Sequence, residues 1–351
     1  MEDRWTRLRQ RMKKEGLDGC IISHPAAIRY FTGLSFSCGE RMIVLLVRQK
    51  GQPVLFLNEL FPLTPRPDFQ LVRFNDTEDG VAVLDPFLSG TVAVDPLWPA
   101  GFVLRLMKRR PDLTLSEENP VDKIRAIKDE QEQQKMRQAS LNNDAVMARV
   151  RQLIQIGKTE KQLEQEIRQA FQQIAHSEPS FETIVAFAEN GADPHATPSD
   201  KVLKEGMSVI IDMGCRFEDY CSDMTRTFFV GHMSMPQVYQ TVLRANLAGI
   251  AAVRPGVRFC DIDRACRQVI EEAGYGPYFT HRTGHGIGLN VHEPFDVSAV
   301  NETQVEAGMC FSIEPGIYLP AVGGVRIEDL VLVTEQGCEV LNHDPKDQPV
   351  L

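Results

Sequence analysis

The segment VIIDMGCRFEDYCSDMTRTFFV, residues 209–230, is the part of the chain that says most about its fold. Two apolar runs flank a polar centre near residues 217–219, a pattern that predicts two antiparallel strands joined by a turn. Asp212 and Asp223 are equidistant from a point between positions 217 and 218. We therefore expect them to face each other across the hairpin, with Cβ atoms about 4.5–5.5 Å apart.

A second pair of segments repeats this arrangement of acids. FSIEPGIYLP (311–320) and VRIEDLVLV (325–333) flank a turn that contains glycine, and Glu314 and Glu328 are centred on position 321. These glutamates are also expected to face each other. Opposed carboxylates repel and are not buried as anions without compensation, so two such pairs in one domain predict a bound cation. Carboxylate oxygens suit divalent metals, and bridging carboxylates can hold two ions about 3.5–4 Å apart.

Histidines supply nitrogen donors for the same site. THRTGHGIGLNVHEP (280–294) contains His281, His285 and His292, and His195 lies in a loop rich in glycine and proline. A histidine ligand beside carboxylates favours manganese, cobalt, iron or zinc over calcium or magnesium. An isolated acidic pair is usually solvated surface, and an isolated histidine usually satisfies a core hydrogen bond. The coincidence of four of the eight histidines with two acidic hairpins is what predicts a metal site.

Composition limits the classes of protein to consider. The 351 residues are 43% hydrophobic and 25% charged, which favours two folded domains over disorder or a coiled coil. The net charge of −10 argues against a nucleic-acid or polybasic membrane binder, and no apolar run approaches the roughly 18 residues that span a bilayer. There is no apolar signal core at the start, and the eight cysteines include no C-x-x-C pair. We therefore expect a cytoplasmic protein with reduced thiols and with no nucleic-acid or membrane partner.

The net charge and the pattern of apolar residues both change near residue 120. Residues 1–120 carry a net charge of +1, and the remainder carries −11. The first part alternates short apolar runs with amphipathic segments, which predicts a small α/β domain. We place the boundary between residues 122 and 123. The strands expected before it are 19–23, 41–47, 53–57 and 91–95, and the helices are 3–16 and 100–110.

The second part, residues 123–351, reads as an α+β domain with antiparallel strands. A long helical pattern covers 129–156, and a second helix begins at Thr159, with Gln162 completing a capping box. The other expected helices are 236–253 and 259–273, and the expected strands are 181–187, 207–217, 221–230, 309–318 and 325–334.

These motifs resemble those of a known metallopeptidase family, which includes methionine aminopeptidase, aminopeptidase P, prolidase and the metal-free creatinase. The matching residues are SDMTRT (222–227) after Asp212, GHG (284–286), EPG (314–316) and RIE (326–328). The resemblance implies an α+β chain whose catalytic domain, 123–351, has the pita-bread fold. Residues 1–122 resemble the smaller α/β N-terminal domain of the creatinase, prolidase and aminopeptidase P branch, with IRYFTG (28–33) as its typical phrase.

The resemblance implies a role for each site residue. Asp212 would bind one divalent ion through both oxygens, Asp223 and Glu328 would bridge two ions, and His285 and Glu314 would complete the second ion's ligands. Manganese is the expected metal, with cobalt, zinc or iron as alternatives. Residues that match substrate-contacting histidines are His195, His281 and His292. Arg326 matches an arginine that lies just outside the metal ligands.

The implied reaction is hydrolysis of the bond before a proline in a di- or oligopeptide. A water activated by two metal ions attacks the carbonyl carbon, Glu314 moves the proton to the leaving nitrogen, and His292 stabilises the oxyanion. Family resemblance also implies a homodimer. Two other hypotheses stay open: hydrolysis of a non-peptide amide or amidine, such as an ectoine- or creatine-like compound, and a non-catalytic binding protein of the same fold.

Two departures from the family bear on specificity. Many relatives read Ala-Ser-Gly where this chain has Ala186, Phe187 and Ala188, which would place a larger apolar surface near the substrate entrance. Prolidases restricted to dipeptides place an arginine between the His292 motif and the Glu-Pro-Gly strand, yet residues 293–313 contain no Arg or Lys. This absence favours longer substrates, as in aminopeptidase P, with a dipeptidase nearly as well supported, unless another residue such as Arg282 serves.

Overall fold

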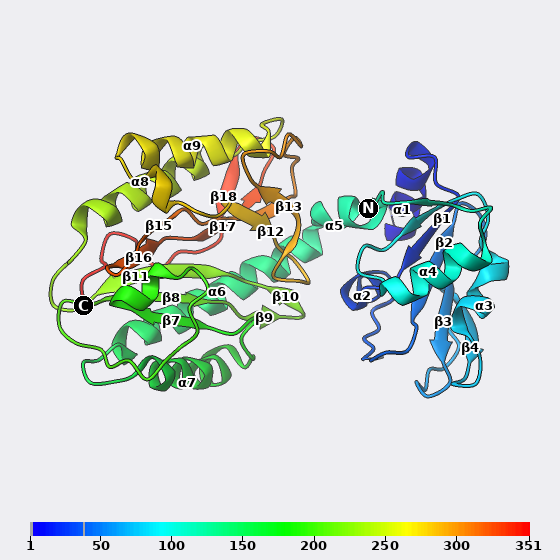
Figure 1. Cartoon of the computed structure of the whole chain (residues 1–351), viewed down its shortest axis with the longest axis horizontal. Coiled ribbons are helices and arrows are strands. Elements are labelled where there is room, and N and C mark those ends of the chain that lie inside the picture. The colour runs from blue at the N-terminus through cyan, green and yellow to red at the C-terminus, as the bar shows by residue number, and fades with distance from the viewer. Residues whose placement is uncertain (1–2, 38) are drawn as a thin grey trace. The chain divides into compact units, whose positions relative to one another are not determined.

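The computed structural model describes residues 3–37 and 39–351, which divide into two compact units (Figure 1). The units are Met1–Arg125 and Ala126–Leu351. Helix α5 (Pro120–Ala126) crosses this division, so the boundary proposed from the sequence falls within the helix. Among the described residues, no helix is long and apolar enough to cross a membrane.

The N-terminal unit is a six-stranded mixed sheet in the order β4-β3-β2-β1-β5-β6. The central pairs β1/β2 and β2/β3 are antiparallel, whereas the pairs β1/β5, β3/β4 and β5/β6 are parallel. The strands are β1 Gly19–Ile22, β2 Val44–Arg48, β3 Val54–Asn58, β4 Gln70–Phe74, β5 Thr91–Val94 and β6 Thr114–Ser116.

Four helices accompany this sheet. They are α1 Arg4–Lys14, α2 Pro25–Thr32, α3 Gly80–Leu84 and α4 Ala100–Arg109. Ile21, Phe56 and Val92 of the strands pack with Leu106 of α4 in one apolar core. Sheet and helices together confirm the small α/β unit that the sequence predicts.

The C-terminal unit contains two antiparallel sheets. The first has the order β11-β8-β7, and the second has the order β13-β12-β14-β17-β18. Two short ribbons, β9/β10 and β15/β16, extend the hairpins. The strands are β7 Ile184–Phe187, β8 Ser208–Met213, β9 Arg216–Phe217, β10 Tyr220–Cys221, β11 Met224–Phe229, β12 Gly284–Gly286, β13 Glu293–Val297, β14 Cys310–Ile313, β15 Gly316–Leu319, β16 Gly323–Arg326, β17 Asp329–Val333 and β18 Cys338–Val340.

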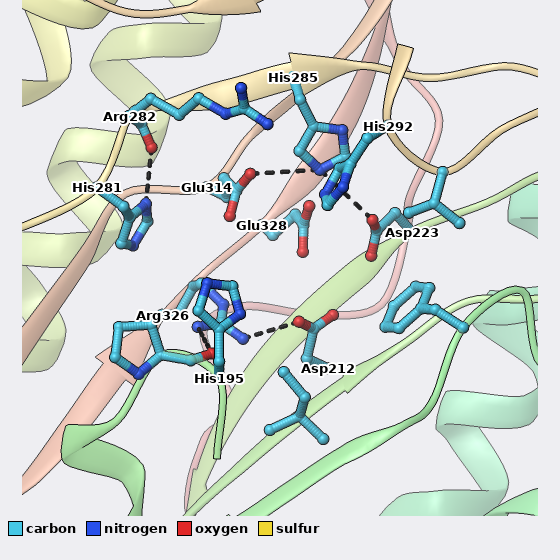
Figure 2. A pocket seen from close by; sticks show the side chains of 14 residues that line it. His195, Asp212, Asp223, His281, Arg282, His285, His292, Glu314, Arg326 and Glu328 are labelled. Carbon is cyan, nitrogen blue, oxygen red and sulfur yellow. Dashed lines mark hydrogen bonds and ion pairs between the residues drawn. The ribbon is translucent and has the colours of Figure 1, made fainter. Parts of the chain in front are cut away.

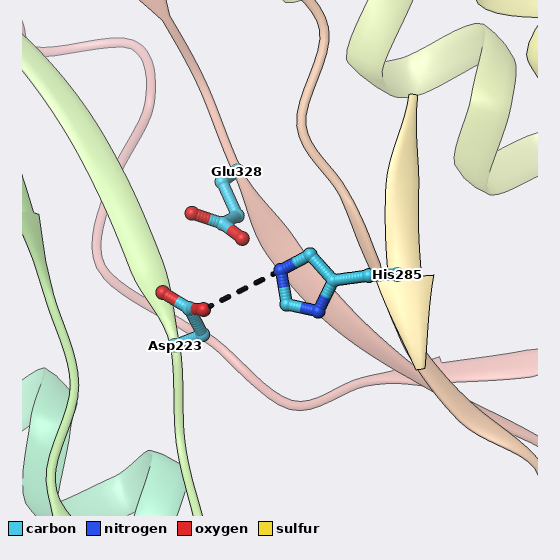
Figure 3. Close-up of side chains that lie close together, drawn as sticks. All are labelled: Asp223, His285 and Glu328. Carbon is cyan, nitrogen blue, oxygen red and sulfur yellow. Dashed lines mark ion pairs between the residues drawn. The ribbon is translucent and has the colours of Figure 1, made fainter. Parts of the chain in front are cut away.

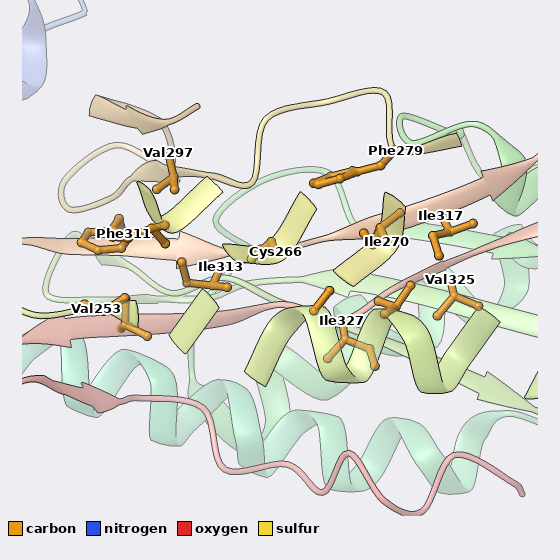
Figure 4. Close-up of a cluster of buried hydrophobic side chains, with 14 of the residues drawn as sticks. Val253, Cys266, Ile270, Phe279, Val297, Phe311, Ile313, Ile317, Val325 and Ile327 are labelled. Carbon is orange, nitrogen blue, oxygen red and sulfur yellow. The ribbon is translucent and has the colours of Figure 1, made fainter. Parts of the chain in front are cut away.

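Two pairs of helices enclose these strands (Figure 1). Helices α6 (Glu130–Leu153) and α7 (Glu160–Ala170) share a core with β7, β8 and β11, and the capping box of Thr159 and Gln162 is confirmed at the start of α7. Helices α8 (Pro236–Ala252) and α9 (Phe259–Glu272) pack against the second sheet, where Ile313 and Ile327 meet Cys266 and Ile270 (Figure 4). The segregation of strands and helices confirms the α+β class.

The first acidic hairpin has a different register from the one expected. Glu218 and Asp219 form its tip with φ of 44° and 74°, so the hairpin is centred between these two residues. Two central residues at positive φ characterise the tight turn whose twist suits a hairpin. Asp212 therefore lies opposite Thr225, and the prediction that it faces Asp223 directly is wrong.

The second acidic hairpin has the expected centre. Ile313 pairs with Asp329 and Gly316 pairs with Arg326, so both ladders are symmetric about position 321. Glu314 lies between β14 and β15, and Glu328 lies between β16 and β17. The two glutamates therefore occupy the short break between two paired segments, where their carboxylates are free to point into the domain.

Candidate metal centre

One cavity gathers all nine side chains predicted to bind metal, contact the substrate or lie just outside the metal ligands (Figure 2). Its volume is about 590 Å³, and all of its lining residues belong to the C-terminal unit. The predicted residues that line it are Asp212, Asp223, His285, Glu314, Glu328, His195, His281, His292 and Arg326. Arg282 and a few apolar side chains complete the wall.

Three of these residues form a compact buried group (Figure 3). Asp223, His285 and Glu328 each offer a ligand atom, and the three atoms lie within 4.8 Å of one another. Nε2 of His285 is 3.7 Å from Oδ2 of Asp223. The backbone N–H of Glu328 donates to the carbonyl of Thr225 at 3.1 Å, which holds the two strands together beside these ligands.

Glu314 and Asp212 extend this group on either side. Oε1 of Glu314 lies 3.5 Å from Nε2 of His285 and accepts a hydrogen bond from Ser312. Asp212 accepts a 2.8 Å hydrogen bond from Arg326 through one oxygen only. Oδ1 of Asp212 and Oδ1 of Asp223 are buried with no hydrogen-bond partner in the described part of the chain. Such orphaned acceptors are costly, and a divalent cation would satisfy both.

The pKa shifts of the acids in this cavity also favour a bound cation. Burial, together with the neighbouring carboxylates, raises the pKa of Asp223 and of Glu328 well above the usual range. Burial also raises the pKa of Glu314 to about 7. Carboxyl groups that are this close must hold protons or a cation, because they cannot all ionise together. The donor set of carboxylate oxygens and one imidazole fits a divalent transition metal.

His285 is oriented to present Nε2 to the carboxylates. Burial lowers its pKa to about 3, so the ring is neutral. Nδ1 lies 3.1 Å from the carbonyl of Gly286, which can only accept, so Nδ1 carries the proton and Nε2 keeps its lone pair. The flanking glycines permit this close packing, because a Cβ on Gly284 would lie 1.9 Å from the carbonyl oxygen of Ser312.

Arg326 connects Asp212 to the part of the cavity wall that contains His195 and His281. Its guanidinium donates to Asp212, to Thr225 Oγ1, to the carbonyl of Pro194 and to Tyr318 OH. Because the Tyr318 hydroxyl accepts from Arg326 at 2.9 Å, its own proton can go to Nε2 of His281, 2.8 Å away. Nδ1 of His281 donates to the carbonyl of Arg282. Both ring nitrogens of His281 therefore have protein partners.

His195 and His292 stand at the exposed side of the cavity. The ring of His292 meets that of His285 edge to face, with centroids 4.1 Å apart. Partial burial and the nearby charge of Arg282 lower the pKa of His292, so its ring is neutral near pH 7 and has one N–H to donate.

The sequence reasoning missed three hydroxyls that form hydrogen bonds with residues of the cavity. Thr225 donates to Glu328 at 2.6 Å, Ser312 donates to Glu314, and Tyr318 bonds both Arg326 and His281. A signal for two of them was present, because Thr225 and Ser312 lie two residues from Asp223 and Glu314. Side chains two apart along a strand share a face.

The expectation for Phe187 is wrong. Its side chain is fully buried in the core formed by α6, α7 and the first sheet, and it does not line the cavity. Phe181 and Ile184 supply the apolar surface there instead. Strand alternation explains the error, because Phe187 and Val185 share one face of β7 while Ile184 and Ala186 share the other.

Comparison with known proteins places this geometry in a family. Residues 134–335 match the model of metallopeptidase family M24, and residues 4–127 match the creatinase/prolidase N-terminal domain. An uncharacterised peptidase of Staphylococcus aureus (strain MW2) is 37% identical over 352 residues, covering 95% of this chain and 97% of that protein.

Solved structures agree over the whole chain. The prolidase of Thermococcus sibiricus is 31% identical with a TM-score of 0.91, and all of both chains is covered. The dipeptidase PepE of Mycobacterium ulcerans is 34% identical with a TM-score of 0.92, covering 99% of this chain and 96% of that one. The resemblance drawn from the sequence motifs is confirmed. The chain belongs to metallopeptidase family M24 and is a metallopeptidase, in which a creatinase/prolidase-type N-terminal domain precedes a pita-bread catalytic domain.

Proposed function

We propose that this chain is a dinuclear metal hydrolase that cleaves the peptide bond between an N-terminal residue and a following proline. The observation that carries the proposal is the convergence of four carboxylates and one neutral imidazole on one cavity, with two buried carboxylate oxygens left unpartnered. The likeness to a prolidase and a dipeptidase over the whole chain supports the same reaction.

We assign the metal ligands as the resemblance implies. Asp212, Asp223, His285, Glu314 and Glu328 would together hold the two ions, with Asp223 and Glu328 at the centre of the set. The mixed oxygen and nitrogen donors support manganese first, with cobalt, zinc or iron as alternatives. Bound there, divalent ions would polarise the scissile carbonyl and lower the pKa of the attacking water.

The protein's own residues move the proton and hold the substrate. Glu314 lies beside the carboxylates that would hold the ions, so it is placed to accept the proton of the water and deliver it to the leaving nitrogen. His292, neutral and at the cavity's exposed side, donates its N–H to the developing oxyanion. His195 contacts the substrate at the same rim. For His281 to do so through Nε2, its hydrogen bond with Tyr318 must open.

Turnover of proline peptides tests the proposal. With manganese or cobalt supplied, the wild type should release the N-terminal residue from Xaa-Pro substrates, and Glu314→Ala should have no measurable turnover. Glu335→Ala is the matched control, because Glu335 is an exposed glutamate outside the cavity. Normal turnover by Glu314→Ala would refute its role. Hydrolysis of an ectoine- or creatine-like amide, with no cleavage of any Xaa-Pro peptide, would establish the alternative reaction.

We also propose a cytoplasmic homodimer. The location is supported by the cysteines, because all seven that the structure describes are free thiols, six of them buried; Cys38 lies outside the described residues. The dimer rests on the family resemblance. A light-scattering mass of one chain at micromolar concentration would contradict it.

A further inference from the structure

Arg282 is a cationic side chain in the cavity wall that the proposed chemistry does not use. It lies between His281 and Thr283, and its side chain extends past Glu314 toward His285 (Figure 2). The residue is exposed, and its guanidinium forms no hydrogen bond or ion pair with any residue that the structure describes. Burial is the main cause of the lowered pKa of His285 and of His292, and the charge of Arg282 adds to both shifts. The same charge partly offsets the raised pKa of Glu314, which is caused mainly by burial.

The other arginine of the cavity cannot take the same role. Arg326 is only 3% exposed, and all of its guanidinium nitrogens donate to protein acceptors. Four carboxylates and two dications would leave the metal group close to neutral. Arg282 then remains as a positive charge at the cavity mouth without a protein counter-ion among the described residues, available to an anionic group of the substrate.

The chemistry of the substrate defines that group. In an Xaa-Pro dipeptide, three covalent bonds separate the scissile carbonyl carbon from the carboxylate carbon of proline. Any residue that binds this carboxylate must therefore lie beside the metal ligands. Arg282 follows His281 and precedes His285 by three residues, and it shares the cavity with both. A guanidinium binds a carboxylate through paired hydrogen bonds.

We infer that Arg282 binds the C-terminal carboxylate of an Xaa-Pro dipeptide and makes the chain a dipeptidase by preference. This inference rests on the proposed function and assigns its substrate length. The lack of arginine and lysine in residues 293–313 favours longer peptides, and the present inference replaces that preference. The cation that would bind the carboxylate is Arg282, which precedes His285 in the chain, and not a residue that follows His292.

Matched substrates and variants test the inference. Leu-Pro and Leu-Pro amide differ in the carboxylate charge, so the wild type should have a kcat/KM about 10- to 100-fold higher for Leu-Pro, the range of one charge-assisted hydrogen bond. Arg282→Gln should remove this preference, mainly through the KM for Leu-Pro, so that the variant has a similar kcat/KM for Leu-Pro and for its amide. Arg282→Lys should restore part of the preference. Arg264→Gln, an exposed arginine of α9 that pairs with Asp261, should behave as wild type.

The outcomes separate this inference from the proposed function. Equal wild-type turnover of Leu-Pro and its amide would overturn the role of Arg282 and leave the Xaa-Pro reaction intact. An equal loss on both substrates in Arg282→Gln would also overturn it, because the side chain would then support the site in general. If the wild type cleaves neither substrate with manganese or cobalt, the proposed function fails and the inference fails with it.

Discussion

Thr225 is the residue whose replacement tests most sharply how the fold holds its acids. Its hydroxyl is fully buried, donates to Glu328 at 2.6 Å and accepts from Arg326 at 3.1 Å. Thr225→Val keeps the shape and removes both bonds. A buried polar group left without its partner costs about 1–3 kcal/mol, and two are affected, so we expect the metal-free protein to lose about 2–6 kcal/mol of unfolding free energy. Loss of the hydroxyl also removes a bond that favours ionised Glu328, so metal affinity should fall.

The stability measurement must report on the C-terminal unit, which contains the cavity. Both tryptophans, Trp5 and Trp98, lie in the N-terminal unit, so their fluorescence does not report on the site. Native-state hydrogen exchange of residues 126–351, with a manganese titration, measures both effects. Thr241→Val is the matched control, because this buried hydroxyl of α8 bonds only the helix carbonyl of Gln237. A loss in Thr225→Val no larger than in the control would refute the reasoning.

Three further changes have defined outcomes. In metal-free protein, the thermal midpoint should fall as pH rises from about 6.5 to 8. Glu314, with a folded pKa of about 7, and the other buried acids hold protons that the unfolded chain releases, whereas the buried histidines, with lowered pKa, are neutral in the folded chain throughout this range. Calorimetry in chelator checks this, and a midpoint that rises over this range would contradict it. Excess manganese should reduce that fall, since bound metal replaces the protons. Ala188 has a φ of 46°, a backbone conformation that glycine adopts with less strain than alanine. Ala188→Gly should therefore stabilise the C-terminal unit by about 0.5–1 kcal/mol in urea unfolding. A loss of stability would contradict backbone strain at this residue. Gly284→Ala should lower the unfolding free energy of the C-terminal unit by more than about 3 kcal/mol or prevent soluble expression, because the added Cβ would lie 1.9 Å from the carbonyl oxygen of Ser312. An unfolding free energy close to that of the wild type would contradict this packing.

The residues of the site could be predicted from the sequence more completely than the register of the hairpins that carry them. Symmetric spacing placed Glu314 and Glu328 together, and the structure has the same centre at position 321. For Asp212 and Asp223 the same reasoning was one residue out in its centre, because Glu218 and Asp219 form a two-residue tip that apolar periodicity does not locate. The two acids still line one cavity, since a small slip along a hairpin moves side chains by only a few ångströms.

The N-terminal strands that the sequence did not predict are those at the edges of the sheet. Gln70–Phe74 and Thr114–Ser116 form β4 and β6, and each pairs on one side only. Neither carries the continuous apolar run of the central strands, because edge strands are partly exposed. Their place is decided by pairing with β3 and β5, which local sequence does not encode.

Local sequence also does not encode the contacts around the proposed metal ligands. The contact between Arg326 and Asp212 joins strands far apart in the chain, and the exposure of Arg282 depends on the path of a loop. Motif spacing singled out the residues that we propose as ligands, whereas the hydrogen bonds that orient them follow from tertiary packing.

Anomalous diffraction from crystals grown with manganese is the most direct test for two metal ions in the cavity. We expect two manganese peaks in each chain, both inside the cavity, with Asp223 and Glu328 shared between them. The same crystals of Asp223→Asn should show reduced occupancy of both peaks. A wild type that cleaves Xaa-Pro peptides with no manganese, cobalt, zinc or iron in the cavity would contradict the account, as would ions bound only outside it.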